Sequence, residues 1–380
     1  MRETTRPDYY SRATSRQQPG NPVSAPLKFR SPDRFRKAVR QRVDDYFAST
    51  GRRRRDCTSM YFKTAIILSS LGASYALLVF GSVSWWLAIP IAILLGLVLA
   101  VAAFNIQHDG GHGAYSNHRW INKLASLTLD LLGGSSYVWA RKHNSIHHSY
   151  TNVTGHDDDI NIGWLGRLSP HQERLKFHRI QHFYMWALYG FLPIKWHLYD
   201  DFRDVLTGRI GGLAFPRPRR WDLVIFLGGK TLFFSLAFVL PMLLNPWWCV
   251  LALYGIASWV LGLTLSVVFQ IAHCVEDAAF PQPCLATNRI ESSWSVHQIK
   301  TTVNFAPRNR LLAWLVGGLN FQIEHHLFPK ICHVHYPAVA KLVEETCREF
   351  GLKYRAYKTF LAGVASHYRW LRQMGMANAA

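Results

Sequence analysis

Three short segments of the sequence contain histidines at a spacing that suits metal binding. They are His108 with His112; His143 with His147 and His148; and His325 with His326, preceded by Gln322. Residues four apart in a helix lie on one face, so the imidazoles of each segment can point at the same ion. A lone histidine is usually structural, but three such clusters together predict a metal centre.

The number of clustered histidines indicates more than one ion. His273 stands alone at the end of a long apolar run, and we expect it to join the seven histidines of the clusters. Neutral imidazole suits iron, copper, zinc or nickel, and eight imidazoles are too many for one four-coordinate ion, so two metals are predicted. The other histidines lack clustered partners and are predicted to be structural: His118, His156, His171, His178, His182, His197, His297, His333, His335 and His367.

Three consecutive carboxylates, Asp157, Asp158 and Asp159, follow His156. Carboxylates can bind metals, but aspartates are mostly exposed in folded proteins. We therefore predict that this run forms a solvated turn or a surface that contacts substrate.

Four apolar runs could carry the metal-binding segments to a membrane. They cover about residues 61–80, 83–104, 223–244 and 247–272. Each has roughly the 20 residues that, at about 1.5 Å rise per residue, cross a hydrocarbon core of about 30 Å. Only a residue or two joins the runs within each pair, so each pair must be a tight helical hairpin. The sequence predicts an all-α integral membrane protein with four transmembrane helices in two hairpins.

Cationic residues flank the hairpins at the ends away from their links. Four arginines at 52–55 precede the first span, and three more within 217–220 precede the third. By the positive-inside rule, both hairpins enter from the cytoplasm and return to it, and both termini lie there. Residues 105–221 and 273–380 are then expected to form a cytoplasmic helical cap that holds the dimetal site.

The ends of the second and fourth spans place His108 and His273 on the same side of the membrane. The apolar segment 124–139 is interrupted by Asp130 and two glycines, so we expect a helix of the cap and not a fifth span. Lys230 lies within the third span. We expect its side chain to extend along the helix to the membrane surface.

The first 60 residues differ in composition from the membrane domain at 61–380. They are rich in Arg, Pro, Ser and Gln and are predicted to form a basic arm, partly disordered or interfacial. Within the arm, residues 29–47 could form an amphipathic helix on the membrane surface. No apolar stretch follows the basic N-terminus until after residue 60, so no cleavable signal peptide is expected.

The composition of the 380-residue chain excludes several classes of protein. With 49% hydrophobic residues and a formal charge of +20, it is neither disordered nor collagen-like. Its six cysteines contain no CxxC pair, which argues against a disulfide framework or a zinc ribbon and favours a reducing compartment.

At the clustered histidines the sequence resembles the membrane fatty acid desaturases, whose signature is three histidine boxes on the cytoplasmic face of four membrane helices. The boxes match as His108-Asp-Gly-Gly-His112, His143-Asn-Ser-Ile-His147-His148 and Gln322-Ile-Glu-His325-His326. The segment ending at His273 is similar to the family's additional ligand site, and residues 320–329 are a highly specific match. Glutamine at the head of the third box resembles the front-end subgroup, which inserts a double bond between an existing one and the carboxyl end. The resemblance covers about residues 60–370.

The resemblance implies two non-haem iron ions held by nine residues: His108, His112, His143, His147, His148, His273, Gln322, His325 and His326. It also implies O2-dependent formation of a cis double bond in a fatty acyl chain carried by coenzyme A or by a membrane lipid. Many front-end members have a fused cytochrome b5 domain with a His-Pro-Gly-Gly motif, which this chain lacks. The bacterial-type members are therefore more similar, and a separate electron donor of the ferredoxin or cytochrome b5 type is expected.

Two other functions fit part of this pattern. A fatty acyl hydroxylase, ketolase or acetylenase would use the same boxes, because hydroxylation and desaturation begin with the same hydrogen abstraction; Gln322 argues against it. A membrane metal transporter would place its ligands near the membrane midplane, whereas these histidines lie past the helix ends.

The positive charge fits anionic lipid headgroups or an acidic electron donor. Nucleic acid is not expected as a partner, because the basic residues flank membrane spans instead of forming a stripe with interleaved aromatics. Trp139, Tyr150, Trp164 and Phe321 could line an acyl channel or belong to an interfacial belt. The sequence leaves open the double-bond position, the chain length, the acyl carrier, the donor, the oligomeric state and whether Gln322 binds metal directly or through water.

Overall fold

The computed structural model describes residues 27–211 and 213–376. Within this part of the chain, four helices are long and apolar enough to cross a membrane: Thr58–Phe80, Trp85–His112, Trp221–Leu244 and Trp247–His273. The first is α2 and the last is α13; the second begins with α3 (Trp85–Ala102), and the third joins α11 (Trp221–Phe234) to α12 (Leu240–Leu244). The four predicted spans are confirmed. Their ends lie within three residues of the predicted bounds, except that the second span continues to His112 instead of ending near residue 104.

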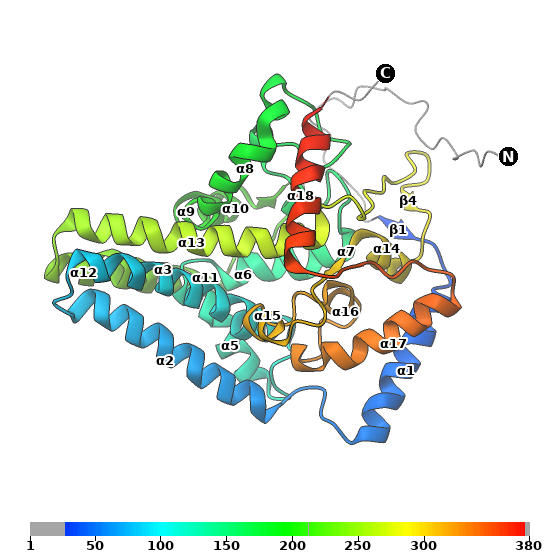
Figure 1. Ribbon diagram of the computed structural model, residues 1–380, viewed down its shortest axis with the longest axis horizontal. Coiled ribbons are helices and arrows are strands. Elements are labelled where there is room, and N and C mark those ends of the chain that lie inside the picture. Colours follow the sequence, from blue (N-terminus) through cyan, green and yellow to red (C-terminus); the bar gives the residue numbers. More distant parts are fainter. Residues whose placement is uncertain (1–26, 212, 377–380) are drawn as a thin grey trace.

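The four spanning helices form two hairpins whose links lie together at the left in Figure 1. The second and fourth helices, α3 and α13, pack along each other at the centre, and α2 and α11–α12 lie outside them. Large apolar side chains cover the outside of this bundle, including exposed tryptophans next to both links: Trp85, Trp86, Trp247 and Trp248. Exposed apolar surface flanked by tryptophans is typical of helices that face lipid and end at its interface.

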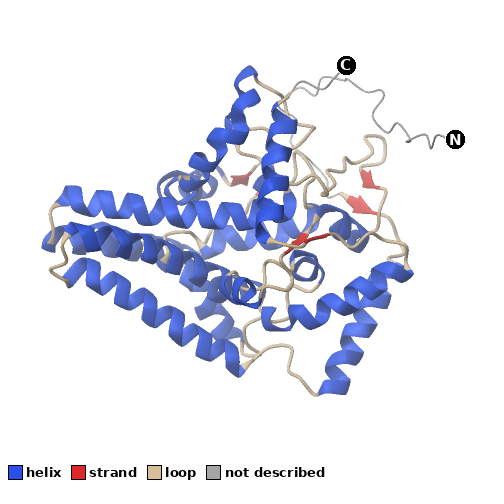
Figure 2. Ribbon diagram, viewed as in Figure 1, coloured by secondary structure: helices blue, strands red, loops and turns tan. Residues whose placement is uncertain are grey.

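The remaining helices form a cap at the opposite end of the bundle (Figures 1 and 2). They are α1 (Arg34–Thr50), α4 (His108–His112), α5 (Arg119–Leu131), α6 (Ser136–Trp139), α7 (His148–Tyr150), α8 (Gln181–Gly190), α9 (Leu192–Lys195), α10 (Asp201–Thr207), α14 (Trp294–Thr301), α15 (Arg310–Leu315), α16 (Gln322–Leu327), α17 (Tyr336–Glu349) and α18 (Phe360–Gly375). The segment around 124–139 becomes part of α5 and α6, and it is not among the four candidate spans of the described residues, as predicted.

Strands are short and few in the described residues (Figure 2). Three two-stranded ladders occur: β1 (Lys28–Phe29) with β4 (Arg289–Ile290) in parallel, β2 (Arg209–Ile210) with β3 (Leu213–Ala214) antiparallel, and β5 (Asn304–Phe305) with β6 (Ala356–Tyr357) in parallel. The β1–β4 and β5–β6 ladders tie together parts of the cap that are far apart in the sequence.

The amphipathic helix expected near the N-terminus forms as α1, but its apolar face does not lie on a membrane. Phe35, Val39, Val43 and Phe47 are buried in a core shared with α17. This prediction was wrong because α17 is itself amphipathic and lies about 300 residues later in the chain, where local patterns cannot reveal the pairing. Residues 1–26 of the predicted basic arm lie outside the described residues, whereas its remaining residues, 27–33 and 51–60, are described and flank α1.

Lys230 also differs from expectation. Its side chain is buried, donates a hydrogen bond of 2.7 Å to the Gly133 carbonyl and pairs at 2.7 Å with the Asp201 carboxylate. Lys230 therefore does not reach the membrane surface, because α10 supplies a carboxylate beside the third spanning helix.

Candidate metal centre

The first box is held at the end of the second spanning helix. A π-helical turn, Ala103–Gln107, separates α3 from α4, which carries His108 and His112. The two glycines between them allow close packing: a Cβ on Gly110 would lie 2.5 Å from Ala125 in α5, and one on Gly111 would lie 2.2 Å from the Trp139 ring. The small residues of this box therefore let α5 and the second box approach the ligands closely.

The second box occupies a π-helical segment, Ala140–His147, followed by α7. A π-helix bonds residues five apart instead of four. Nε2 of His143 lies 3.3 Å from Nε2 of His148, its neighbour at that spacing, and the His143 ring also stacks beside that of His147 at 5.2 Å. This geometry brings three histidines of one short segment to the centre, which the ordinary helical spacing assumed from sequence would not do.

The third box and the isolated histidine complete the cluster. α16 carries Gln322, His325 and His326, and His273 is the last residue of α13. The Gln322 amide nitrogen lies 2.9 Å from Nε2 of His273 and 3.4 Å from Nε2 of His326. The structure thus brings all nine predicted ligands together, and none of them exposes more than 8% of its surface.

The ligand atoms divide into two groups that could each hold an ion. The first group is His108, His112, His143 and His325, and the second is His147, His273 and His326; within each, the candidate atoms all lie within 4.8 Å of one another. His148 forms a third such group with His325 and His326, so it lies between the other two. Gln322 contacts only the second group.

Several inward-facing nitrogens have no protein partner. Nε2 of His108, His112, His147 and His325 is buried without a hydrogen bond. Buried polar atoms are nearly always paired, and four unpaired imidazole nitrogens at one place fit metal coordination. The donor set suits a first-row transition metal, since imidazole binds iron, copper, zinc and nickel.

The outer nitrogens of the same rings are held by neighbouring groups. Nδ1 of His147 donates to the Asp157 carboxylate at 3.1 Å, and Nδ1 of His326 donates to the Gln298 side-chain oxygen at 2.8 Å. Nδ1 of His325 lies 3.3 Å from the Tyr336 hydroxyl. Partners of this kind fix the tautomer and the ring orientation of metal-binding histidines.

The acidic run was predicted incorrectly to be a solvated turn or a substrate surface. Asp157 is buried and accepts hydrogen bonds from the backbone of Asn152 and Asp159 as well as from His147. Asp159 lies 3.5 Å from His147 and 3.8 Å from His143. The loop after α7 folds these carboxylates back beneath the second box, and the sequence gives no local sign of that turn.

The protonation of the box histidines follows from their burial. Burial lowers the pKa of His148, His325 and His326 far below the usual value, and neighbouring imidazoles lower it further. Burial also lowers the pKa of His147, but the charge and hydrogen bond of Asp157 outweigh this and raise it. His148, His325 and His326 are therefore neutral, and each has a free lone pair for a metal.

Sequence reasoning missed the polar groups that surround the ligands. Gln298, Tyr336 and Asp157 come from three separate elements, and nothing in their spacing marks them. Glu324 lies inside the third box but turns away from the centre, accepting hydrogen bonds from Asn304 at 2.8 Å and from the Tyr354 hydroxyl at 3.0 Å. Burial raises the pKa of Glu324 to about 7.

The histidines predicted to be structural are not among the grouped ligands of the centre, although His333 belongs to a separate group with Asp109 and Cys332. Its ring bridges the Asp109 carboxylate at 2.9 Å and the Lys63 ammonium at 3.1 Å, just behind the first box.

Of the aromatic residues suggested for an acyl channel, Trp139 stacks on His143 with ring centres 4.7 Å apart. Phe321 is buried in the core beneath α1 and α17, and Trp164 is largely exposed. Only Trp139 of these three is in a position to contact a chain bound at the centre.

Comparison with known proteins matches the chain to a single family. The family model for fatty acid desaturase matches residues 84–358. The sn-1 linoleoyl-lipid 6-desaturase of Synechocystis sp. is 39% identical over 355 residues, covering 93% of this chain and 98% of that protein. The protein of the same name from Arthrospira platensis is 39% identical over 344 residues, covering 90% and 93%. The acyl-lipid (8-3)-desaturase of Physcomitrium patens is 38% identical over 346 residues, covering 90% and 72%.

Proposed function

Because the chain belongs to the fatty acid desaturase family, we propose that it is a front-end acyl-lipid desaturase that inserts a cis double bond with O2 as co-substrate. The observation that carries this proposal is the convergence of nine buried ligands, with unpaired Nε2 atoms, at the ends of two spanning helices. The relatives described above are named for lipid-linked substrates, which favours a membrane lipid over coenzyme A as the acyl carrier.

Two iron ions are the proposed occupants of the centre. The first would be held by His108, His112, His143 and His325, and the second by His147, His273, His326 and Gln322, with His148 beside both. When bound, the irons would supply the O2 reduction and hydrogen abstraction that no side chain can perform on unactivated methylenes. Gln322 would bind through its side-chain oxygen, directly or through a water molecule, once its amide turns from the orientation that places the nitrogen beside His273.

The protein's own contribution is to hold the ligand rings in position and to exclude water from the centre. The Nε2 atoms of His108, His112, His147 and His325 are left unpaired for a metal, and Asp157 and Gln298 hold the rings of His147 and His326 in place from outside. Trp139, stacked on His143, gives the centre an apolar wall. An apolar wall beside a strongly oxidising centre limits its side reactions.

The location of the centre suits a substrate that stays in the membrane. His112 and His273 terminate the second and fourth candidate spans, so a lipid acyl chain would reach the ligands from the bilayer without leaving it. The arginines at 52–55 precede the first span, and by the positive-inside rule we place the cap, both termini and the metal centre in the cytoplasm.

The proposal is tested by expressing the chain in a host fed a panel of polyunsaturated fatty acids and analysing intact lipids by mass spectrometry. The expected result is an acyl chain that has lost two hydrogens, with the new double bond on the carboxyl side of an existing one. His325→Ala is expected to remove the product while the protein still inserts. His118→Ala, at an exposed histidine outside the centre, is the matched control and is expected to retain activity.

Other outcomes would contradict the proposal. A gain of one oxygen atom in the acyl chain would indicate a hydroxylase. Metal flux into vesicles, without any change in the lipids, would indicate a transporter. Full activity of His325→Ala would refute the ligand assignment.

A further inference from the structure

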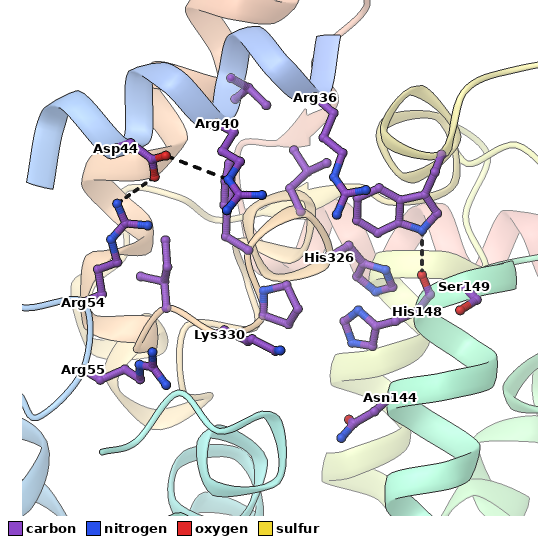
Figure 3. A pocket seen from close by; sticks show the side chains of 16 residues that line it. Arg36, Arg40, Asp44, Arg54, Arg55, Asn144, His148, Ser149, His326 and Lys330 are labelled. Carbon is purple, nitrogen blue, oxygen red and sulfur yellow. Dashed lines mark hydrogen bonds and ion pairs between the residues drawn. The ribbon is translucent and has the colours of Figure 1, made fainter. Parts of the chain in front are cut away.

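One cavity in the described part of the chain reaches the metal centre from outside the membrane bundle. It has a volume of about 690 Å³ and lies between α1, α14, the second box and the segment after α16 (Figure 3). We call it the basic pocket, because its charged lining consists of Arg36, Arg40, Arg54, Arg55 and Lys330 with a single carboxylate, Asp44.

The inner end of the basic pocket is formed by two proposed metal ligands. His148 and His326 both line it, and their rings stack with centres 4.3 Å apart. In Figure 3 these two rings lie next to each other below the ribbon of α1, with Arg36 and Arg40 above them and Arg54 and Arg55 to the left. The pocket is therefore a place where the otherwise buried ligand cluster approaches the protein surface.

The positive charge of the rim is only partly neutralised. Asp44 pairs with Arg54 at 2.6 Å and lies 3.8 Å from Arg40. Within the described residues, no ion pair with Arg36, Arg55 or Lys330 occurs. Arg36 and Lys330 are exposed and come from different segments, α1 and the segment after α16. Cations spread around a rim attract an acidic surface and orient it as it approaches.

An aromatic side chain links this rim to the second box. The guanidinium of Arg36 lies 4.6 Å from the ring centre of Trp294, and the indole nitrogen of Trp294 donates a hydrogen bond of 3.1 Å to the carbonyl of His148. The rim, the indole and a metal-binding residue are thus in continuous contact over a short path.

We propose that the basic pocket is the docking site of an acidic one-electron carrier protein, whose electrons enter the centre past Trp294, His148 and His326. The inference rests on the proposed function, because O2-dependent desaturation consumes two electrons that the acyl chain does not supply. In each turnover, two reduced carriers each lose one electron. These two electrons and two protons from water, with two hydrogens from the acyl chain, reduce O2 to two molecules of water.

A protein surface fits this rim better than a lipid headgroup does. The cations come from three separate segments, namely α1, the arginines before α2 and the loop after α16, and all five line the pocket. A single anionic headgroup would contact only part of such a set. An acidic patch on a partner protein could face all of it.

The test uses the iron-loaded, full-length protein in nanodiscs of neutral lipid, with an acidic plant-type ferredoxin as donor. Two variants reverse charge in different segments that line the pocket: Arg36→Glu with Arg40→Glu in α1, and Lys330→Glu after α16. Lys37→Glu is the matched control, because Lys37 is an exposed cation of α1 that does not line the pocket. Ferredoxin affinity is measured directly, and product formation is measured with ferredoxin and with photoreduced 5-deazariboflavin, a small uncharged reductant.

The expected result is a loss of at least about tenfold in kcat/KM for ferredoxin in both rim variants, with a matching loss of affinity. Turnover with the deazaflavin and the behaviour of Lys37→Glu should match the unmodified protein. The difference should shrink as the salt concentration rises from about 0.05 to about 0.5 M, because salt screens exposed charges.

Two results would overturn the docking proposal. Unchanged ferredoxin affinity in both rim variants would show that the donor docks elsewhere. An equal loss with both reductants, at unchanged ferredoxin affinity, would assign the pocket to a substrate headgroup. The affinity measurement does not depend on desaturation, so a protein that binds ferredoxin at this rim but forms no lipid product would refute the proposed reaction and leave the docking site standing.

Discussion

Each imidazole of the metal centre has two nitrogens, and the structure gives them different surroundings. The inner nitrogens of four box histidines are buried without partners, whereas the outer nitrogens of His147 and His326 are hydrogen-bonded to Asp157 and Gln298. The ligands could be predicted from sequence because their spacing is local. The outer partners could not, because each depends on a contact that only the folded chain creates.

The role of Asp157 leads to a first prediction. In Asp157→Asn, the charge that orients His147 is lost, and iron affinity is expected to fall by about 10- to 100-fold. The iron content of the purified protein, titrated against a chelator, measures the effect. Asp158→Asn is the control, because Asp158 pairs with Lys142. Equal iron affinity in both variants would show that Asp157 does not support the centre.

A buried histidine outside the centre gives a prediction about pH. Burial, more than the opposing contact with Thr151, lowers the pKa of His297 to about 4. The unfolded chain takes up a proton as the pH falls below about 6.5, but the folded chain does so only near 4, so stability is lost across this window as the pH falls. The loss from this residue amounts to about 3 kcal/mol.

His297→Phe should remove this contribution. Thermal unfolding of the two proteins in detergent is compared from about pH 7 to about pH 4. The variant is expected to lose less stability than the unmodified protein over this range. Parallel stability curves would show that His297 is not protonated differently in the folded and unfolded states.

At the scale of elements, the first two boxes are positioned by close packing between their helices. Gly110 and Gly111 allow α4 to contact α5 and Trp139, and the second box adopts a π-helical turn. Binary patterns in the sequence located the four spans and predicted a cap helix within 124–139, where α5 and α6 lie, because apolar length and periodicity are local signals. The same patterns could not reveal the π-helical turns, which depend on how the box packs against its neighbours.

Gly111→Ala tests this close packing. Its Cβ would lie 2.2 Å from the Trp139 ring, so the two boxes would have to separate, and loss of most iron and activity is expected. Gly72→Ala is the control, because nothing lies within 4 Å of the added atom in that helix. Iron content and lipid product are measured for both. If Gly111→Ala retained the iron content of Gly72→Ala, the boxes would not require this contact.

The ion pair between α11 and α10 gives a prediction about stability. Removing one member of a buried pair leaves an uncompensated charge, which costs about 3–5 kcal/mol. Lys230→Met should therefore lower the melting temperature strongly, because Asp201 remains buried. The double variant Lys230→Met with Asp201→Leu should recover part of the loss. A single variant as stable as the unmodified protein would mean that the pair is not needed to hold these helices together.

At the scale of the whole molecule, the two hairpins extend to one side and the cap lies at the other, with the metal centre where they meet (Figure 1). The sequence predicted this division from the four spans and from the positions of His108 and His273. It did not predict that α1 packs onto α17, nor that this packing builds one wall of the basic pocket. Both depend on pairing between distant segments.

The proposed orientation is tested through the link of the first hairpin. Ser82→Cys places a thiol between α2 and α3, on the side away from the cap. In intact cells, a thiol reagent that cannot cross the membrane should label it from outside, whereas the exposed native Cys284 of the cap should react only after lysis. Labelling of Cys284 before lysis would reverse the assigned topology.

The pairing of α1 with α17 also has a consequence for the order of events during synthesis. Arg42 bonds to Thr346, which is 304 residues later, so α1 leaves the ribosome long before its partner exists. At about 5–20 residues per second, the interval is some tens of seconds. During this interval the spanning helices can insert while the apolar face of α1 remains uncovered. Docking of α1 then completes the rim beside the metal centre, and we expect it to be among the last steps of maturation.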